Sequence, residues 1–169
     1  MNFKKGKVFI KEKAELIPYI DGQDYYDLIK NCGNKGYTQI ILTTDFILEI
    51  FKYYFIKRKF NLVEIIPLDD DEIEMKNKFK QYTTMLEEDR DNFTYIISDL
   101  DFLSKEKNSV DIFKIELKGS SLNGKRVRIN IQINGIIHIT DTCYEDEKAV
   151  LCEIINKHLS ENRWKTKTF

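Results

Sequence analysis

The amino-acid sequence predicts an α+β fold with a mixed or antiparallel sheet of about five to seven strands, covered mainly on one side by helices. Residues 111–140 alternate apolar and polar side chains, a pattern typical of a three-stranded antiparallel meander. A helical pattern at 145–160 follows this meander and closes the chain. Because the strands are grouped and the final helix is separate from them, α+β is favoured over a doubly wound fold.

The first quarter of the chain alternates between short extended and helical patterns. Lys7 to Ile10 is expected to form a short strand, and Glu15 to Ile20 a turn or the start of a helix around its proline. Asp24 to Cys32 has apolar residues on one side of a helix, and Gly33 is a typical helix stop. Tyr37 to Thr43 is rich in residues that favour strands, and its small polar members predict a strand buried on both faces.

The segment Phe46 to Phe60 is the most apolar part of the chain. Asp45 is a suitable N-cap, and Glu49, Lys52 and Lys59 fall in one narrow stripe of a helix, so the rest of that helix must be covered. A central buried helix is the main expectation, although the aromatic and β-branched content also permits a strand. An interface between copies of the chain and an interfacial membrane helix remain alternatives.

The middle of the chain continues with a strand at Leu62 to Ile66, ended by Pro67. Asp69 to Asp71 then place carboxylates where a helix N-terminus is most positive, and the helix is expected to run to about Arg90. Thr94 to Ser98 is predicted to be another strand, followed by a loop. The apolar seam of the helix consists of Met75, Phe79, Tyr82 and Leu86.

The turn at Asn134-Gly135 can close the meander in two registers. A two-residue turn pairs Ile131 with His138 and buries the histidine. A three-residue loop with Gly135 in the left-handed region pairs Ile131 with Ile137 and leaves His138 on the polar face. Since burying two isoleucines stabilises the fold by roughly 1.5–3 kcal/mol each, the second register is predicted. The inward residues are then Phe113, Ile115, Val127, Ile129, Ile131, Ile137 and Ile139.

Length and composition predict one globular domain spanning residues 1–169. Apolar residues make up 42% of the chain and charged residues 33%, which excludes a disordered protein. The net charge of −1 gives no general attraction to nucleic acid or membranes. The three cysteines have no regular spacing, no signal-peptide core is recognisable, and no segment is long enough to span a membrane. A cytoplasmic protein with free thiols and no cofactor is expected.

Asp99 and Asp101 are the main candidate for metal chemistry, because the spacings of His138, Cys143, Cys152 and His158 match no usual pair of zinc ligands. If they follow a strand, two carboxylates at this spacing point the same way and could hold a divalent ion for phosphoryl or nucleotidyl transfer. The pair resembles the metal-binding carboxylates of nucleotidyltransferases. In that family, however, a Gly-Ser phosphate loop precedes the pair, whereas here Gly119-Ser120 follows it.

The polar face of the meander is the best candidate for binding. Its mixture of positive and amide side chains suits phosphate groups or an acidic partner, but it lacks the exposed aromatics that stack on single-stranded bases. We therefore expect a non-enzymatic protein of the inhibitor, immunity or mobile-element type that binds a macromolecular partner; nucleic-acid binding and metal-dependent chemistry are the alternatives. The expected binding residues are Lys114, Lys118, Arg126, Arg128, Asn130, Gln132 and His138.

Overall fold

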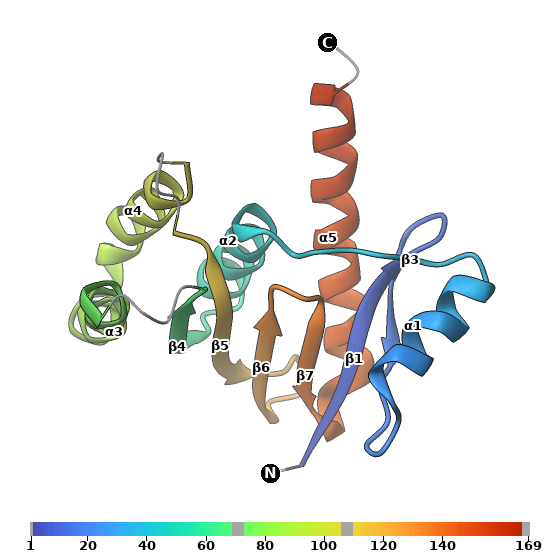
Figure 1. Ribbon diagram of the computed structural model, residues 1–169. Helices are drawn as coiled ribbons and strands as arrows, with labels where there is room; N and C mark the ends of the chain where they lie inside the picture. The colour runs from blue at the N-terminus through green and yellow to red at the C-terminus, as the bar shows by residue number, and fades with distance from the viewer. Residues whose placement is uncertain (1, 69–72, 106–109, 167–169) are drawn as a thin grey trace.

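A single antiparallel sheet forms the centre of the protein, in agreement with the predicted α+β class (Figure 1). The computed structural model describes residues 2–68, 73–105 and 110–166, with side chains to residue 162. A short strand, β3 (Thr38–Gln39), pairs with β1 outside the main strand order. The other strands lie side by side in the order β2 (Ala14–Pro18), β1 (Phe3–Ile10), β7 (Ile136–Thr140), β6 (Arg126–Gln132), β5 (Ile112–Ser120) and β4 (Asn61–Pro67).

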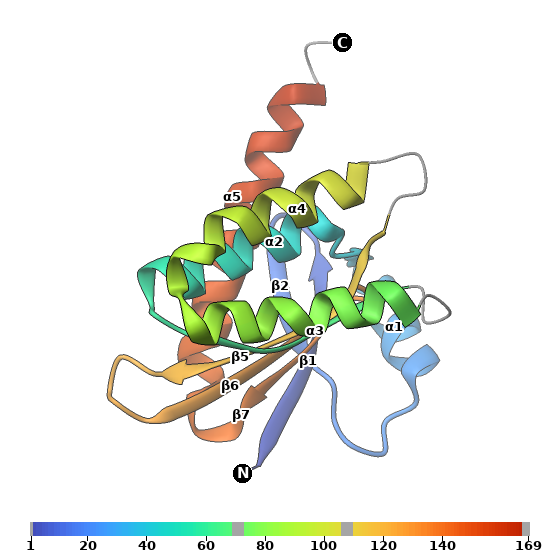
Figure 2. The ribbon, with the colours of Figure 1, turned by 90° about the vertical axis from the view of Figure 1, so that its left-hand side faces the viewer.

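Helices cover the two faces of this sheet unequally. Val8 belongs to the main core with residues of α2 and α5, whereas its neighbour Phe9 belongs to a small cluster with Leu28 and Cys32 of α1. Successive strand residues point to opposite faces, so α1 covers the second face near β1 only. Figure 1 shows α2 and α5 behind the sheet, and Figure 2 shows α3 and α4 together beside its β4 edge. The helices are α1 (Tyr25–Asn34), α2 (Thr44–Lys52), α3 (Ile73–Glu88), α4 (Phe93–Lys105) and α5 (Tyr144–Thr166).

The predicted register of the meander is confirmed. Ile131 pairs with Ile137 and Asn130 with His138, and Gly135 has a φ of 83°. Ile129, Ile131, Ile137 and Ile139 are all fully buried against the helices. One inward assignment is wrong, because Ile112 is buried while Phe113 is only half-buried. The pairing of β4 with β5 shifts at this point, since Ile66 opposes Lys114 but Pro67 opposes Ile112.

The apolar segment Phe46 to Phe60 is a central buried helix, as expected. It begins as α2 and continues as a π-helix, η1 (Tyr53–Lys57). Its N-cap is Thr43 and not the predicted Asp45. The apolar side chains that raised the alternatives of an oligomer interface or a membrane helix are buried inside this chain, except for exposed Ile56 and half-buried Tyr53. The buried set comprises Phe46, Ile47, Leu48, Ile50, Phe51, Tyr54, Phe55 and Phe60.

A buried ion pair ties this helical segment to α5. The Arg58 guanidinium donates to Glu147 at 2.6 Å, and the Tyr54 hydroxyl donates to the same carboxylate at 2.7 Å. The Glu147 side chain is only 1% exposed. Arg90 stabilises the end of the segment, because it donates to the carbonyls of Phe55 and Phe60.

Three predicted elements are wrong. Glu15 to Ile20, expected as a turn or helical start, belongs mainly to strand β2, where Pro18 lies at the sheet edge. Only Thr38 and Gln39 of the predicted strand at Tyr37 to Thr43 pair with β1, and both are exposed. Thr94 to Ser98 is helical, because Phe93, Ile96 and Leu100 recur at helical spacing and bury one face of α4. The predicted helix start at Asp69 to Asp71 lies outside the described residues.

Candidate binding face

The polar side of the sheet is the surface that the helices leave uncovered between α1 and the β4 edge. Strand alternation turns the polar residues of β5, β6 and β7 to this side, since their alternate neighbours fill the main core. Lys5 joins them because β1 lies beside β7 and pairs Lys5 with His138. We call this surface the outer face, and its members are Lys5, Glu64, Lys114, Glu116, Lys118, Arg126, Arg128, Asn130, Gln132 and His138.

Ion pairs neutralise part of the positive charge on the outer face. Arg128 pairs with Glu116 across neighbouring strands at 3.2 Å, and Lys114 pairs with Glu64 at 3.5 Å. Lys118 and Arg126 are exposed and have no ion pair within the described residues. The free positive charge is therefore concentrated at the end of the meander near the β5–β6 turn.

Three hydrogen-bonding atoms near the centre of the outer face are buried without a partner in the described part of the chain. They are Nε of Arg128, Oδ1 of Asn130 and Nδ1 of His138. Asn130 and His138 oppose each other on neighbouring strands, and Arg128 precedes Asn130 by two positions on the same face. Buried polar atoms in folded proteins are nearly always hydrogen-bonded, so this group provides unused donor and acceptor capacity. A ligand or an ordered water molecule could use it.

His138 is surrounded by positive charge as well as being half-buried. Burial lowers the pKa of His138, and the nearby charges of Lys5 and Lys114 lower it further. Both effects favour the neutral imidazole, which carries one donor and one acceptor nitrogen. A neutral His138 beside the Asn130 amide can therefore act as a hydrogen-bond donor or as an acceptor toward a polar partner.

Adjacent strands bring together all the residues predicted for the outer face, because the predicted register is correct. Lys5 was not predicted, since the sequence does not reveal that β1 pairs with β7. Lys7, two residues further on, is also turned to this side, but it is buried and donates to the carbonyl of Asn134. The alternation of Lys5 and Lys7 with Gly6 and Val8 is the local signal that could have extended the predicted strand.

Asp99 and Asp101 do not lie at the end of a strand, which was the premise of the metal hypothesis. Both are in α4, where residues two positions apart point in different directions. Asp99 accepts a hydrogen bond from the Tyr82 hydroxyl and pairs with Lys78 at 3.2 Å. Asp101 pairs with Lys105 one turn away at 3.0 Å. Each carboxylate thus has its own partners and helps to fix the helices.

Neither a metal cluster nor a membrane-spanning helix is found in the described ranges. No group of three or more histidine, cysteine or acidic side chains within 2–68, 73–105 and 110–162 could hold a metal ion. The helices of the described part are too short or too polar to cross a membrane. Cys32, Cys143 and Cys152 are free thiols, as predicted.

Comparison with known proteins adds no functional assignment to this geometry. No family model, curated protein or solved structure matches the chain.

Proposed function

We propose that this chain is a non-enzymatic binding protein that recognises an acidic surface of a partner protein through its outer face. The observation that carries the proposal is the trio of unpartnered buried atoms on Arg128, Asn130 and His138, placed on the part of the sheet face that α1 leaves uncovered. A partner that supplies carboxylate and amide groups would satisfy these atoms. Exposed Lys118 and Arg126 would then add long-range attraction to negative charge.

A protein partner is favoured over nucleic acid by the charges on the face. Glu64 and Glu116 neutralise two of the basic residues and would repel a phosphate backbone. Nucleic-acid binding also depends on several unpaired cations or on exposed aromatic rings for stacking. The outer-face residues named above include no aromatic side chain, and on this side of β1 the exposed ring of Phe3, which pairs with Thr140, is a single ring and not a stacking series.

Charge reversal at the exposed end of the face tests the proposal. The variant combines Lys118→Glu with Arg126→Glu, and the matched control is Lys157→Glu on α5, which packs on the opposite face of the sheet. Each protein is used for affinity capture from an extract of the native cell, and every captured protein is then purified and titrated. We expect an acidic partner that binds the wild type and the control equally and loses at least about tenfold in affinity for the double variant.

Equal binding by all three proteins would contradict the proposed role of the outer face. Titration with short duplex DNA and single-stranded RNA at low and high salt separates the nucleic-acid alternative. Salt-sensitive binding that the double variant loses would replace a protein partner with a nucleic acid.

A further inference from the structure

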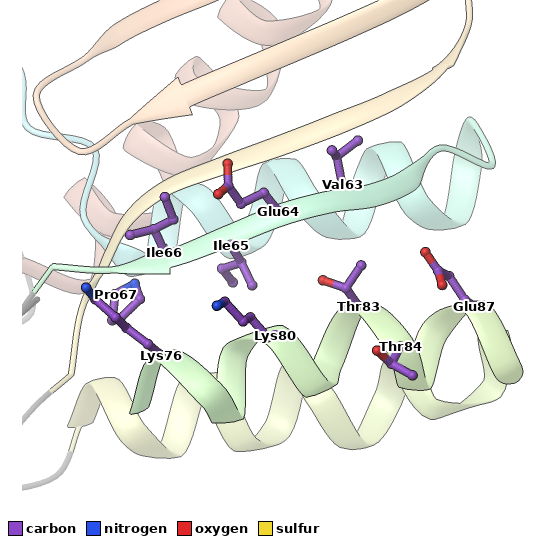
Figure 3. A pocket seen from close by; sticks show the side chains of 10 residues that line it. All are labelled: Val63, Glu64, Ile65, Ile66, Pro67, Lys76, Lys80, Thr83, Thr84 and Glu87. Carbon is purple, nitrogen blue, oxygen red and sulfur yellow. The ribbon is translucent and has the colours of Figure 1, made fainter. Parts of the chain in front are cut away.

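A groove runs along one edge of the sheet, between the free edge of β4 and helix α3 (Figure 3). Its volume is about 660 Å³, which is within the range of sites that bind ligands. Residues Val63 to Pro67 form one wall, and α3 forms the other. Figure 3 shows Lys80, Thr83 and Glu87 of α3 directed toward the strand.

The two walls match in length. A strand of five residues such as Val63 to Pro67 spans about 16 Å, and the eleven-residue step from Lys76 to Glu87 on α3 also spans about 16 Å. The groove-facing residues of α3 recur at spacings of four, three and four, so they form a continuous stripe next to the buried seam of that helix. One extended peptide of about five residues would fill this length.

The opposite edge of the sheet shows how a helix can close such a groove. There β2 lies beside α5, with a hollow of about 710 Å³ between them. The Tyr19 N–H donates inward to Lys5, so alternation turns Ala14, Leu16 and Pro18 outward. Ala14 donates to the Asn156 side chain at 2.7 Å, and the Leu16 N–H interacts with the Cys152 thiol. Pro18 has no N–H. At each of the three outward positions of β2, the backbone N–H therefore either has a partner on α5 or does not exist.

The β4 edge has no comparable closure among the described residues. The Leu68 N–H donates inward to Asp111, and alternation therefore turns the backbone of Ile65 and Pro67 toward the groove. No hydrogen bond to the N–H or C=O of Ile65 is present within the described ranges. Ile65 thus offers a donor and an acceptor to a strand placed in the groove, and Pro67 offers an acceptor.

The length of backbone available limits what can bind. A bulge at Val63 and the proline at position 67 interrupt regular pairing at the two ends of the groove. Helix α3 also stands beside the edge, which hinders a second sheet from aligning with β4 (Figure 2). These features favour one short extended segment over edge-to-edge pairing of two copies.

The charges of the groove select among such segments. Lys80 of α3 lies nearer the Pro67 end, and Glu87 lies toward the Val63 end (Figure 3). The Thr83 side chain lies between them and can hydrogen-bond a peptide. An occupant with an acidic residue at one end and a basic residue at the other complements this arrangement.

We infer that the groove between β4 and α3 binds a short extended peptide segment of a partner protein by strand addition to Ile65. The segment carries an acidic side chain next to Lys80 and a basic one next to Glu87. The groove borders the outer face at Glu64, which belongs to both surfaces, but the inference does not depend on the function proposed for the outer face.

Hydrogen exchange provides a first test on the unliganded protein. We expect the Ile65 amide to exchange by local opening at least about tenfold faster than the amides of Ala14 and Leu16, because only the latter have helix partners. An Ile65 amide as strongly protected as these two would show that the β4 edge is already closed, and would overturn the inference.

Peptide selection provides the second test. A library of random heptapeptides with blocked ends is selected on the wild type, and the selected peptides are titrated against variants. Thr83→Arg fills the groove and is expected to weaken binding at least about tenfold. Lys80 is exposed, and Lys80→Glu is expected to change the selected peptide residue next to position 80 from acidic to basic. A peptide N-methylated at the residue opposite Ile65 is expected to lose binding as well.

The control variants separate this site from the other surfaces. Lys118→Glu with Arg126→Glu and Lys148→Glu beside the β2 edge should both retain the selected peptides. The inference fails if no peptide is enriched, or if Lys80→Glu selects the same residues as the wild type. Light scattering that reports a concentration-dependent dimer, lost in Lys80→Glu, would instead assign the groove to a second copy of the chain.

Discussion

At the scale of single residues, the buried carboxylate of Glu147 is the interaction with the clearest energetic consequence. It is 1% exposed and accepts hydrogen bonds from both Arg58 and Tyr54. Burial raises the pKa of Tyr54 and the charge of Glu147 raises it further, so the phenol remains protonated and continues to donate. Removing one partner of a buried pair leaves the other charge without compensation.

Glu147→Gln should therefore lower the free energy of unfolding by about 3–5 kcal/mol, measured by urea denaturation. The matched control is Glu145→Gln on the same helix, where the carboxylate is 76% exposed. That variant should change stability by no more than about 0.5 kcal/mol. A loss below about 1 kcal/mol for Glu147→Gln would show that the ion pair contributes little beyond an ordinary hydrogen bond.

The lowered pKa of His138 predicts how the free energy of unfolding depends on pH. Because its pKa is lowered by burial and by Lys5 and Lys114, the unfolded chain binds a proton at His138 before the folded chain does. Stability should therefore fall as the pH decreases below the ordinary histidine pKa of about 6.5, toward the lower folded pKa. His138→Gln should reduce this decline between about pH 7 and 5, measured by urea denaturation at several pH values. Identical pH slopes would contradict the assigned pKa shift.

At the scale of elements, strand β5 passes so close to Phe60 that a glycine is required. A Cβ at Gly119 would lie 2.3 Å from the ring of Phe60, which is fully buried and cannot move aside. Gly119→Ala should cost about 1–3 kcal/mol of stability through overpacking, measured by thermal or urea unfolding. Gly33→Ala in α1 meets no atom within 4 Å and should stabilise by up to about 1 kcal/mol. Equal stability of the two variants would contradict this packing.

The elements also show how far local sequence patterns determine the structure. The register of the second hairpin was predictable, because Asn134-Gly135 and the alternating isoleucines leave one arrangement that buries Ile131 and Ile137 together. The residues 94–98 were mistaken for a strand because Thr, Tyr and Ile favour strands locally. Contacts such as the stacking of Phe93 on Phe55, with ring centroids 4.3 Å apart, outweigh that preference in the folded protein.

The candidate sites were predictable to different degrees. The outer face follows from alternation within one local stretch, so most of its residues could be named from the sequence. Lys5 could not, because its place depends on pairing between β1 and β7, more than a hundred residues apart in the chain. The groove depends on the position of α3 beside β4, which no local pattern specifies.

At the scale of the whole molecule, one continuous core connects the sheet with the helices. The main cluster includes Val8 of β1, Phe51 of α2, Ile96 of α4 and Ile155 of α5. Elements that share a core are expected to unfold together. Far-UV and near-UV circular dichroism should therefore report the same urea midpoint, and separate midpoints would indicate independent units.

The position of β1 between β2 and β7 has a consequence for synthesis of the chain. On the ribosome the β1–β2 hairpin emerges early, but the strand that pairs with its other side, β7, is made only after residue 135. Until then β3 can pair only with Phe9 and Ile10 on that edge of β1, and the hydrophobic residues Val8 and Leu16 have no α5 to cover them. Closure of the sheet must therefore await the synthesis of β7, and until then the β1–β2 hairpin exposes apolar residues that favour aggregation.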